Sequence, residues 1–86
     1  MGKYSVELSS TAFKALKKMP REDLHRILRM IKSFETDPFP YGSIKLSGMD
    51  KVYRVRLGNF RIIYEVNNNV LTVLVLKVGH RRDVYR

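Results

Sequence analysis

The chain has 86 residues and a formal net charge of +9, from 17 Lys and Arg against 8 Asp and Glu, and it contains no cysteine. This length suits one small domain, and the lack of cysteine excludes disulfides and thiolate metal sites. Because no signal peptide or membrane span is evident and the charge is strongly positive, we expect a soluble intracellular protein whose partner is a nucleic acid rather than an acidic protein.

The N-terminal part predicts a short strand followed by two helices. Tyr4–Leu8 alternates polar and apolar residues, which is typical of a strand. A capping serine precedes a first helix over Ala12–Lys18, whose Phe13 and Leu16 we expect to face inward. Pro20 ends this helix and opens the next one, where its missing N–H costs nothing.

The second helix has the clearest period in the chain. Its apolar residues recur at i, i+3, i+4, i+7 and i+10, which predicts a single apolar stripe. The stripe consists of Leu24, Ile27, Leu28, Ile31 and Phe34. Asp37–Gly42 has two prolines and a glycine and predicts a loop, after which Ile44–Leu46 can add a short strand.

A β-hairpin is predicted from two alternating segments, Val52–Leu57 and Phe60–Val66, which flank a two-residue Gly-Asn turn. With that loop length Arg56 lies opposite Arg61, and Arg54 shares their face. Like charges directly opposite each other destabilise a sheet. Three arginines on one face therefore indicate a bound anion, with a structural or partner-binding role as the alternative.

The last predicted strand, Val70–Val78, is apolar on both faces, which indicates a central strand that Gly79 ends. The order of elements predicts an α+β fold, in which two N-terminal amphipathic helices pack on one face of a small antiparallel sheet. The arginines then lie on the opposite face. The residues after Gly79 form a polar tail.

Over nearly its whole length the chain resembles the RelE family of the RelE/ParE superfamily of toxins. The resemblance rests on Lys45–Gly48, on Tyr53–Glu65, on His80–Tyr85 and on the helical hairpin. It implies a single RelE-like toxin domain over residues 1–86 with a microbial-ribonuclease-like fold. It also implies a cytoplasmic endoribonuclease that needs neither metal nor cofactor and cuts mRNA in the ribosomal A site. The implied partners are the ribosome, mRNA and a RelB-like antitoxin. Promoter DNA is expected to bind only through the complex with the antitoxin, and no binding to a membrane is expected.

The resemblance places the family's active positions on Arg54, Arg56, Arg61, Arg81 and Tyr85. We expect RNA or ribosome contacts from Lys45, Lys51, Lys77, His80 and Arg82. In well-studied members the first two active positions are often lysine, and arginine does not give up its proton. The general base therefore stays open, with Tyr85, His80 and Glu65 as candidates, and an ion-pair role as the alternative for Glu65.

Two other functions stay open. A ParE-like DNA gyrase inhibitor shares the fold but generally lacks the full set of basic residues and tyrosine. A non-catalytic subunit that binds antitoxin and nucleic acid is favoured by arginine in place of lysine. The presence of the whole set favours the nuclease.

Overall fold

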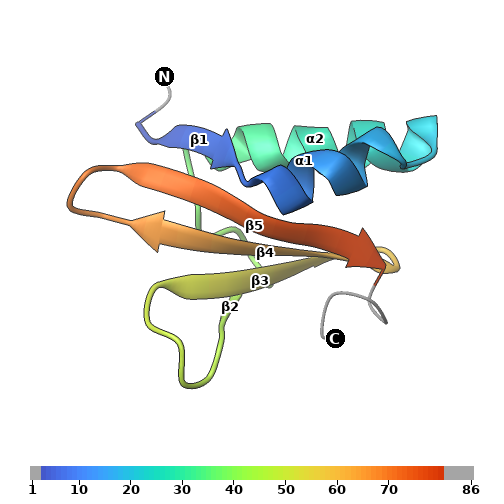
Figure 1. Ribbon diagram of the computed structural model, residues 1–86. Coiled ribbons are helices and arrows are strands. Elements are labelled where there is room, and N and C mark those ends of the chain that lie inside the picture. Colours follow the sequence, from blue (N-terminus) through green and yellow to red (C-terminus); the bar gives the residue numbers. More distant parts are fainter. Residues whose placement is uncertain (1–2, 81–86) are drawn as a thin grey trace.

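The structure is a computed structural model that describes residues 3–80. Two helices and a five-stranded sheet form two layers (Figure 1). The elements in chain order are β1 (Ser5–Leu8), α1 (Ser10–Lys17), α2 (Arg21–Ser33), β2 (Ile44–Lys45), β3 (Val52–Leu57), β4 (Phe60–Asn67) and β5 (Thr72–His80). Neither helix has the length and apolar character that crossing a membrane requires.

The sheet has the strand order β1-β5-β4-β3-β2 and is mixed. Val6 of β1 lies beside Val73 of β5 in a parallel pair, whereas the other three strand pairs are antiparallel. The predicted antiparallel sheet is therefore wrong at this edge, and the helices follow β1 rather than opening the chain. A parallel pair needs a long crossover connection. The local pattern of a four-residue strand does not indicate the direction of such a distant partner.

Helix α1 begins at a serine that also ties it to the sheet. The Ser9 hydroxyl accepts a hydrogen bond from the Ala12 N–H at 3.0 Å and donates one to the Leu76 carbonyl at 2.8 Å. Ala12 and Leu16, four residues apart, lie on the buried side. Phe13 is 53% exposed, so the expectation that it faces inward is wrong. Phe13 lies beside the buried side of α1, which Ala12 and Leu16 form, and not on it.

Helix α2 packs its stripe on the sheet, although the buried part is narrower than predicted. Ile27 and Ile31 are buried, and so is Phe34 directly after the helix, but Leu28 is 41% exposed. The Phe34 ring stacks on Tyr64 with centroids 4.2 Å apart. The core between the layers consists of Ala12, Leu16, Ile27, Ile31, Phe34, Val55, Ile62, Tyr64, Val66, Val73, Val75 and Val78.

Tyr64 also holds the loop after α2 against the sheet. Its hydroxyl donates to the Pro38 carbonyl at 2.8 Å. Burial raises the pKa of Tyr64 from 10.0 to about 12. Phe39, from the same loop, meets Tyr53 edge-on at 5.1 Å. The aromatic residues therefore connect the loop, α2 and the middle of the sheet.

Strand β5 is displaced along the chain from its predicted range, Val70–Val78. The strand begins two residues later and continues through Gly79 to its end. The Asn67 side-chain oxygen accepts hydrogen bonds from the N–H groups of Asn69 and Val70, at 3.0 and 3.3 Å, and so extends the turn. Gly79 does not end the strand, because it has a ladder partner on β4.

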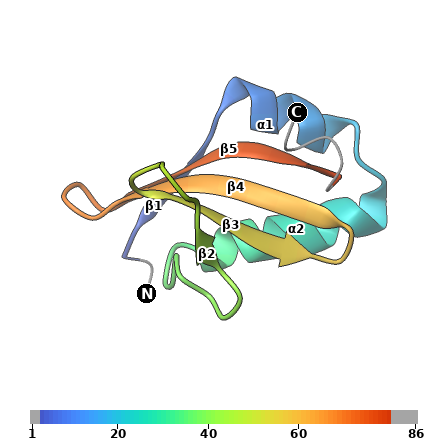
Figure 2. The same ribbon diagram turned by 90° about the horizontal axis from the view of Figure 1, so that it is seen from below.

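The two faces of the sheet differ. We call the side packed on the helices, with Val55, Ile62 and Tyr64, the covered face. Seen from below (Figure 2), strands β4 and β3 lie in front of α2, and neither helix lies over this side. We call this second side the open face, and it includes Arg54 and Arg56.

Candidate nucleic-acid interface

The turn between β3 and β4 sets the register of the hairpin. Leu57 pairs with Phe60 across the two-residue loop, as predicted. Gly58 has a φ of +63°, whereas Asn59 is not left-handed, which is the pattern of a type II′ turn. A Cβ on Gly58 would lie 3.4 Å from the Arg26 guanidinium of α2. Glycine is therefore required by the backbone and fits closely beneath the helix.

This register brings three arginines onto the open face. Arg56 lies directly opposite Arg61, and we call these two the arginine pair. Arg54 lies two residues before Arg56 and opposite Ile63. The predicted juxtaposition is confirmed. Because the pair follows the one that closes the turn, it is of the non-hydrogen-bonded type, with Cα atoms about 4.5 Å apart and side chains at their closest.

The three arginines differ in depth. Arg61 lies on a central strand and is only 7% exposed. Among residues 3–80 it is the charged residue that is buried. Arg54 is half-buried and Arg56 is exposed. A guanidinium keeps its charge at any ordinary pH. The open face therefore holds one permanent positive charge below its surface and one in contact with solvent, which together suit a polyanion.

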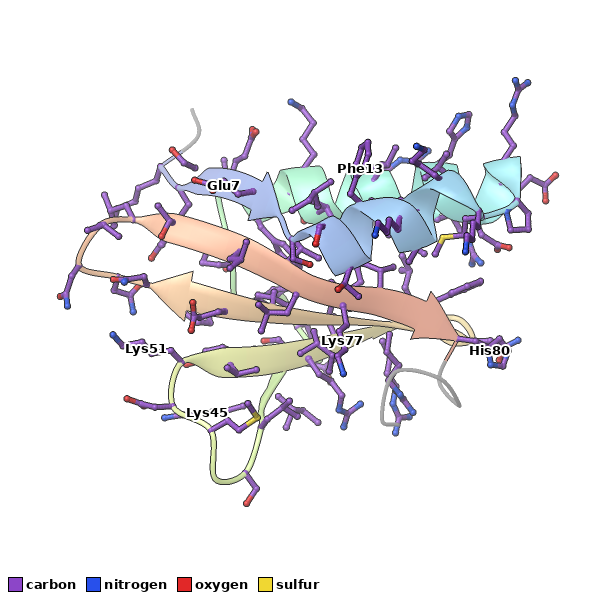
Figure 3. The ribbon with its side chains drawn as sticks, viewed as in Figure 1. Glu7, Phe13, Lys45, Lys51, Lys77 and His80 are labelled. Carbon is purple, nitrogen blue, oxygen red and sulfur yellow. The ribbon has the colours of Figure 1, made fainter. Side chains whose placement is uncertain are left out.

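Two further predicted contact residues lie on β5, on opposite faces of the sheet. Lys77 pairs with Ile63 and projects away from the helices, on the open face (Figure 3). His80 pairs with Phe60, and the two rings meet edge-on at 5.9 Å. Since Phe60 packs toward the core, His80 lies near the arginine pair along the strands but belongs to the covered side of the sheet.

The other two predicted lysines lie at the far end of the sheet from His80 (Figure 3). Lys45 pairs with Tyr53, which belongs to the covered face, and its ammonium group is 3.6 Å from the Asp50 carboxylate. Lys51 precedes β3 with a φ of +67°. The structure thus brings Lys77, but not Lys45, onto the face of the arginines, and Lys51 lies outside the paired strands.

Three predicted site residues lie outside the described residues. They are Arg81, Arg82 and Tyr85. Their roles stay predictions. On the open face Glu65 pairs with Val52, and within residues 3–80 it forms no ion pair.

The open face also has an apolar floor that the sequence reasoning missed. Val52 and Ile63 are buried there, with Leu46 and Leu76 packed against them. Ile63 was a detectable signal, because it is apolar at a position where the alternation of β4 calls for a polar residue. This floor separates Arg54 on β3 from the basic side chain on β5.

Two hollows of the described residues lie away from the arginines of the open face. A hollow of about 600 Å³ lies at the turn Lys45–Asp50, and another of about 310 Å³ lies between α2 and Leu57. Neither hollow is lined by Arg54 or the arginine pair. Residues 3–80 hold no group of three His, Asp or Glu side chains placed to bind a metal ion. The arrangement suits an extended anion laid along the sheet.

These features define a small α+β protein with one face covered by helices and one cationic face. Residues 6–85 match the family described as the ParE toxin of the type II toxin–antitoxin system parDE. The chain is 32% identical to the putative toxin RelE1 of Methanocaldococcus jannaschii, over 98% of this chain and 97% of that protein. It is 27% identical to the toxin RelG of Mycobacterium tuberculosis, over 96% and 97%.

Solved structures agree with these relatives. The archaeal RelE–RelB complex of Pyrococcus horikoshii superposes with a TM-score of 0.83 and 32% identity, over 94% of this chain and 98% of that chain. The chain belongs to the RelE family of toxins of type II toxin–antitoxin systems, within the RelE/ParE superfamily.

Proposed function

We propose that this toxin is an endoribonuclease that cuts mRNA in the A site of the ribosome and so inhibits translation. The observation that carries the proposal is the arginine pair, Arg56 opposite Arg61, on the open face of a RelE-type fold. Two arginines directly opposite each other on a sheet place like charges side by side, and an anion bound by both offsets their repulsion. The phosphodiester of RNA provides one.

The chemistry assigned to this face is attack of the 2′-OH on the adjacent phosphorus, with loss of the 5′ oxygen. The products are a 2′,3′-cyclic phosphate and a 5′-OH. Arg56 and Arg61 hold the nonbridging oxygens, on which negative charge develops in the transition state. Arg54, one row along the sheet, holds a neighbouring phosphate. The resemblance to the family adds Arg81 and Tyr85 to the site.

The proposal includes a requirement for the ribosome, which is supported by the position of both hollows away from the arginines of the open face. An RNA strand held only by its phosphates on the face of a sheet does not have its 2′-OH fixed in line for attack. Correct orientation of reacting groups accounts for a large part of the rate of such reactions. The ribosome is proposed to supply it by holding the message, so free RNA is cut poorly.

A RelB-like antitoxin is the proposed partner. The solved complexes of the relatives from Pyrococcus horikoshii and Mycobacterium tuberculosis are described as RelE–RelB and RelBE2 toxin–antitoxin complexes. In this proposal the antitoxin blocks the toxin, and the complex contacts promoter DNA through the antitoxin. A toxin that acts on translating ribosomes works in the cytoplasm. The proposal also includes a single toxin domain and cleavage without a metal ion.

The test is primer extension on translated messages with the purified full chain and ribosomes. Arg56→Ala is the informative variant, because Arg56 is exposed and its loss leaves the core intact. Removing one preorganised charge that contacts the transition state should slow A-site cleavage by about 10²- to 10³-fold. Arg29→Ala, an exposed arginine on α2 in the other layer, is the matched control and should cleave within a few fold of the wild type.

Equal cleavage by Arg56→Ala and the wild type would refute the assignment of the open face. Intact messages in the presence of wild-type protein would refute the nuclease itself. Thermal unfolding of both variants shows whether a loss of cleavage reflects a loss of folding.

The second candidate is inhibition of DNA gyrase, which the match to a family described as ParE toxins favours. The two functions separate in one comparison, because a gyrase inhibitor leaves messages intact and blocks DNA supercoiling. The arginine pair favours the nuclease. A protein that stopped supercoiling and spared translated mRNA would establish the second candidate.

A further inference from the structure

Strand β5 contains a β-bulge opposite the middle of β4. Tyr64 pairs with Val75, but the next residue of β4 toward the turn, Ile63, pairs with Lys77. Leu76 is therefore the extra residue. A bulge of this kind shifts the alternation of the strand, so that side chains beyond it exchange faces.

The exchange decides where the basic side chain of β5 lies. Continuing the register from Val75 without a bulge would put Lys77 opposite Ile62, inside the core, and Val78 opposite Arg61 on the open face. With the bulge Val78 is buried and Lys77 is exposed. Burying an unpaired ammonium group is costly. The bulge avoids this cost, because it places Val78 in the core and Lys77 on the same face as the arginines.

The resulting positions form two neighbouring rows across the open face. One row runs Arg54–Ile63–Lys77, and the other runs Arg56–Arg61–Gly79. Lys77 is thus a diagonal neighbour of Arg61, at a Cα distance of about 7–8 Å, within reach of a long side chain. Gly79 has no side chain beside Arg61, which leaves the path from Lys77 to the arginine pair open on β5.

Lys77 differs chemically from its neighbours on this face. The guanidinium groups of Arg54, Arg56 and Arg61 do not give up a proton to become neutral at ordinary pH, whereas a lysine ammonium can donate one. The acidic residues that the register places on this face, Glu65 and Glu7, lie in one row with Leu74, beyond Ile63 from Arg61. His80 belongs to the covered side. Among the described residues, Lys77 is the proton donor next to the arginine pair.

We propose that the Lys77 ammonium is the general acid of the cleavage, which rests on the proposed endoribonuclease function. The 2′ oxygen attacks phosphorus and releases its proton to water while the bond from phosphorus to the 5′ oxygen breaks. Lys77 gives a proton from Nζ to that leaving oxygen and regains one from solvent afterwards. The products are a 2′,3′-cyclic phosphate and a 5′-OH, and no other reactant is consumed.

The test compares two leaving groups in the same ribosome-bound message. One message has the ordinary 5′ oxygen at the scissile bond, and the other has a bridging 5′ sulfur, which departs as a thiolate without protonation. Lys77→Arg keeps the charge and removes the proton donor, and Lys77→Gln removes both. Both variants should cut the oxygen message about 10²- to 10⁴-fold more slowly than the wild type. On the sulfur message, the cleavage rate of Lys77→Arg should be within a few fold of the wild-type rate. Lys77→Gln should regain on the sulfur message most of the rate that it loses on the oxygen message.

Arg56→Ala is the control, because a residue that stabilises charge on the phosphate should be slow on both messages. A merely electrostatic role for Lys77 predicts that Lys77→Arg cuts the oxygen message normally and that Lys77→Gln is equally slow on both. Either result overturns the proposal. Failure of the wild type to cut either message would instead refute the endoribonuclease function on which the proposal rests. Since Lys77 is exposed, thermal unfolding should show that the variants fold normally.

Discussion

The two faces of the sheet use the same strands for different purposes. On the covered face Ile62, Tyr64 and Val75 are completely buried against the helices. On the open face the buried residues are Arg61 and a small apolar floor, Val52 and Ile63, and Arg54 and Lys77 flank Ile63. We therefore expect stability to depend mostly on the covered face, and reactions that use charged groups to occur on the open face. The alternation of side chains along a strand makes this separation possible.

The largest expected effect on stability comes from the covered face. Phe34→Ala removes a completely buried ring that stacks on Tyr64. It should lower the free energy of unfolding by about 4 kcal/mol, because the cavity cannot close fully. Urea denaturation measures this value. Phe39→Ala, at a ring that is 40% exposed, is the control. If the two variants lost equal stability, the two-layer core would not be the main source of stability.

A smaller loss is expected from the floor of the open face. Ile63→Ala should cost about 2 kcal/mol, at the low end for such a change, because its cluster is small. The matched control is Ile44→Ala, an isoleucine in the same row of the same face that is half exposed. It should change stability by less than about 0.5 kcal/mol. Equal effects in urea denaturation would mean that the floor does not contribute to folding.

The smallest effect concerns one hydroxyl group on the covered face. Tyr64→Phe keeps the stacked ring and removes the hydrogen bond to the Pro38 carbonyl, which should cost about 1 kcal/mol at neutral pH. Burial raises the pKa of Tyr64 from 10.0 to about 12, so the unfolded chain loses the phenol proton first. The contribution of the neutral phenol is therefore complete below pH 10 and is lost as the pH rises toward 12.

Urea denaturation of the wild type and Tyr64→Phe across that pH range measures the difference directly. The advantage of the wild type should shrink as the pH rises through the interval. Lysines also titrate there, but they are common to both proteins and cancel. A constant difference between the two proteins would show that the phenol ionises equally in the folded and unfolded states.

The hairpin and its charges were accessible from the sequence because their determinants are local. A two-residue turn and strict alternation set the pairing of Arg56 with Arg61 without any other part of the chain. The period of α2 likewise predicted a helix that packs on a sheet. Leu28 shows the limit of such patterns, since periodicity gives the direction of the buried stripe but not its width.

The bulge in β5 shows where local patterns are insufficient. The buried residues Val73, Val75 and Val78 break a period of two, which is a signal of an irregular strand. In a run that is apolar on both faces, however, that signal is hidden, because Leu74 and Leu76 are as apolar as the core valines. The side on which Lys77 lies was therefore undecided until β4 supplied its register.

The sequence by itself determined the hairpin, its register, the two amphipathic helices and the separation of apolar from basic residues, because turns and periodicity act over a few residues. Only the tertiary structure decided the parallel pairing of β1 with β5, the depth of Arg61 and the opposite sides taken by Lys77 and His80. Each of these depends on contact with a strand that is distant in the chain or pairs irregularly, and the free energy of that contact is not encoded in any short segment.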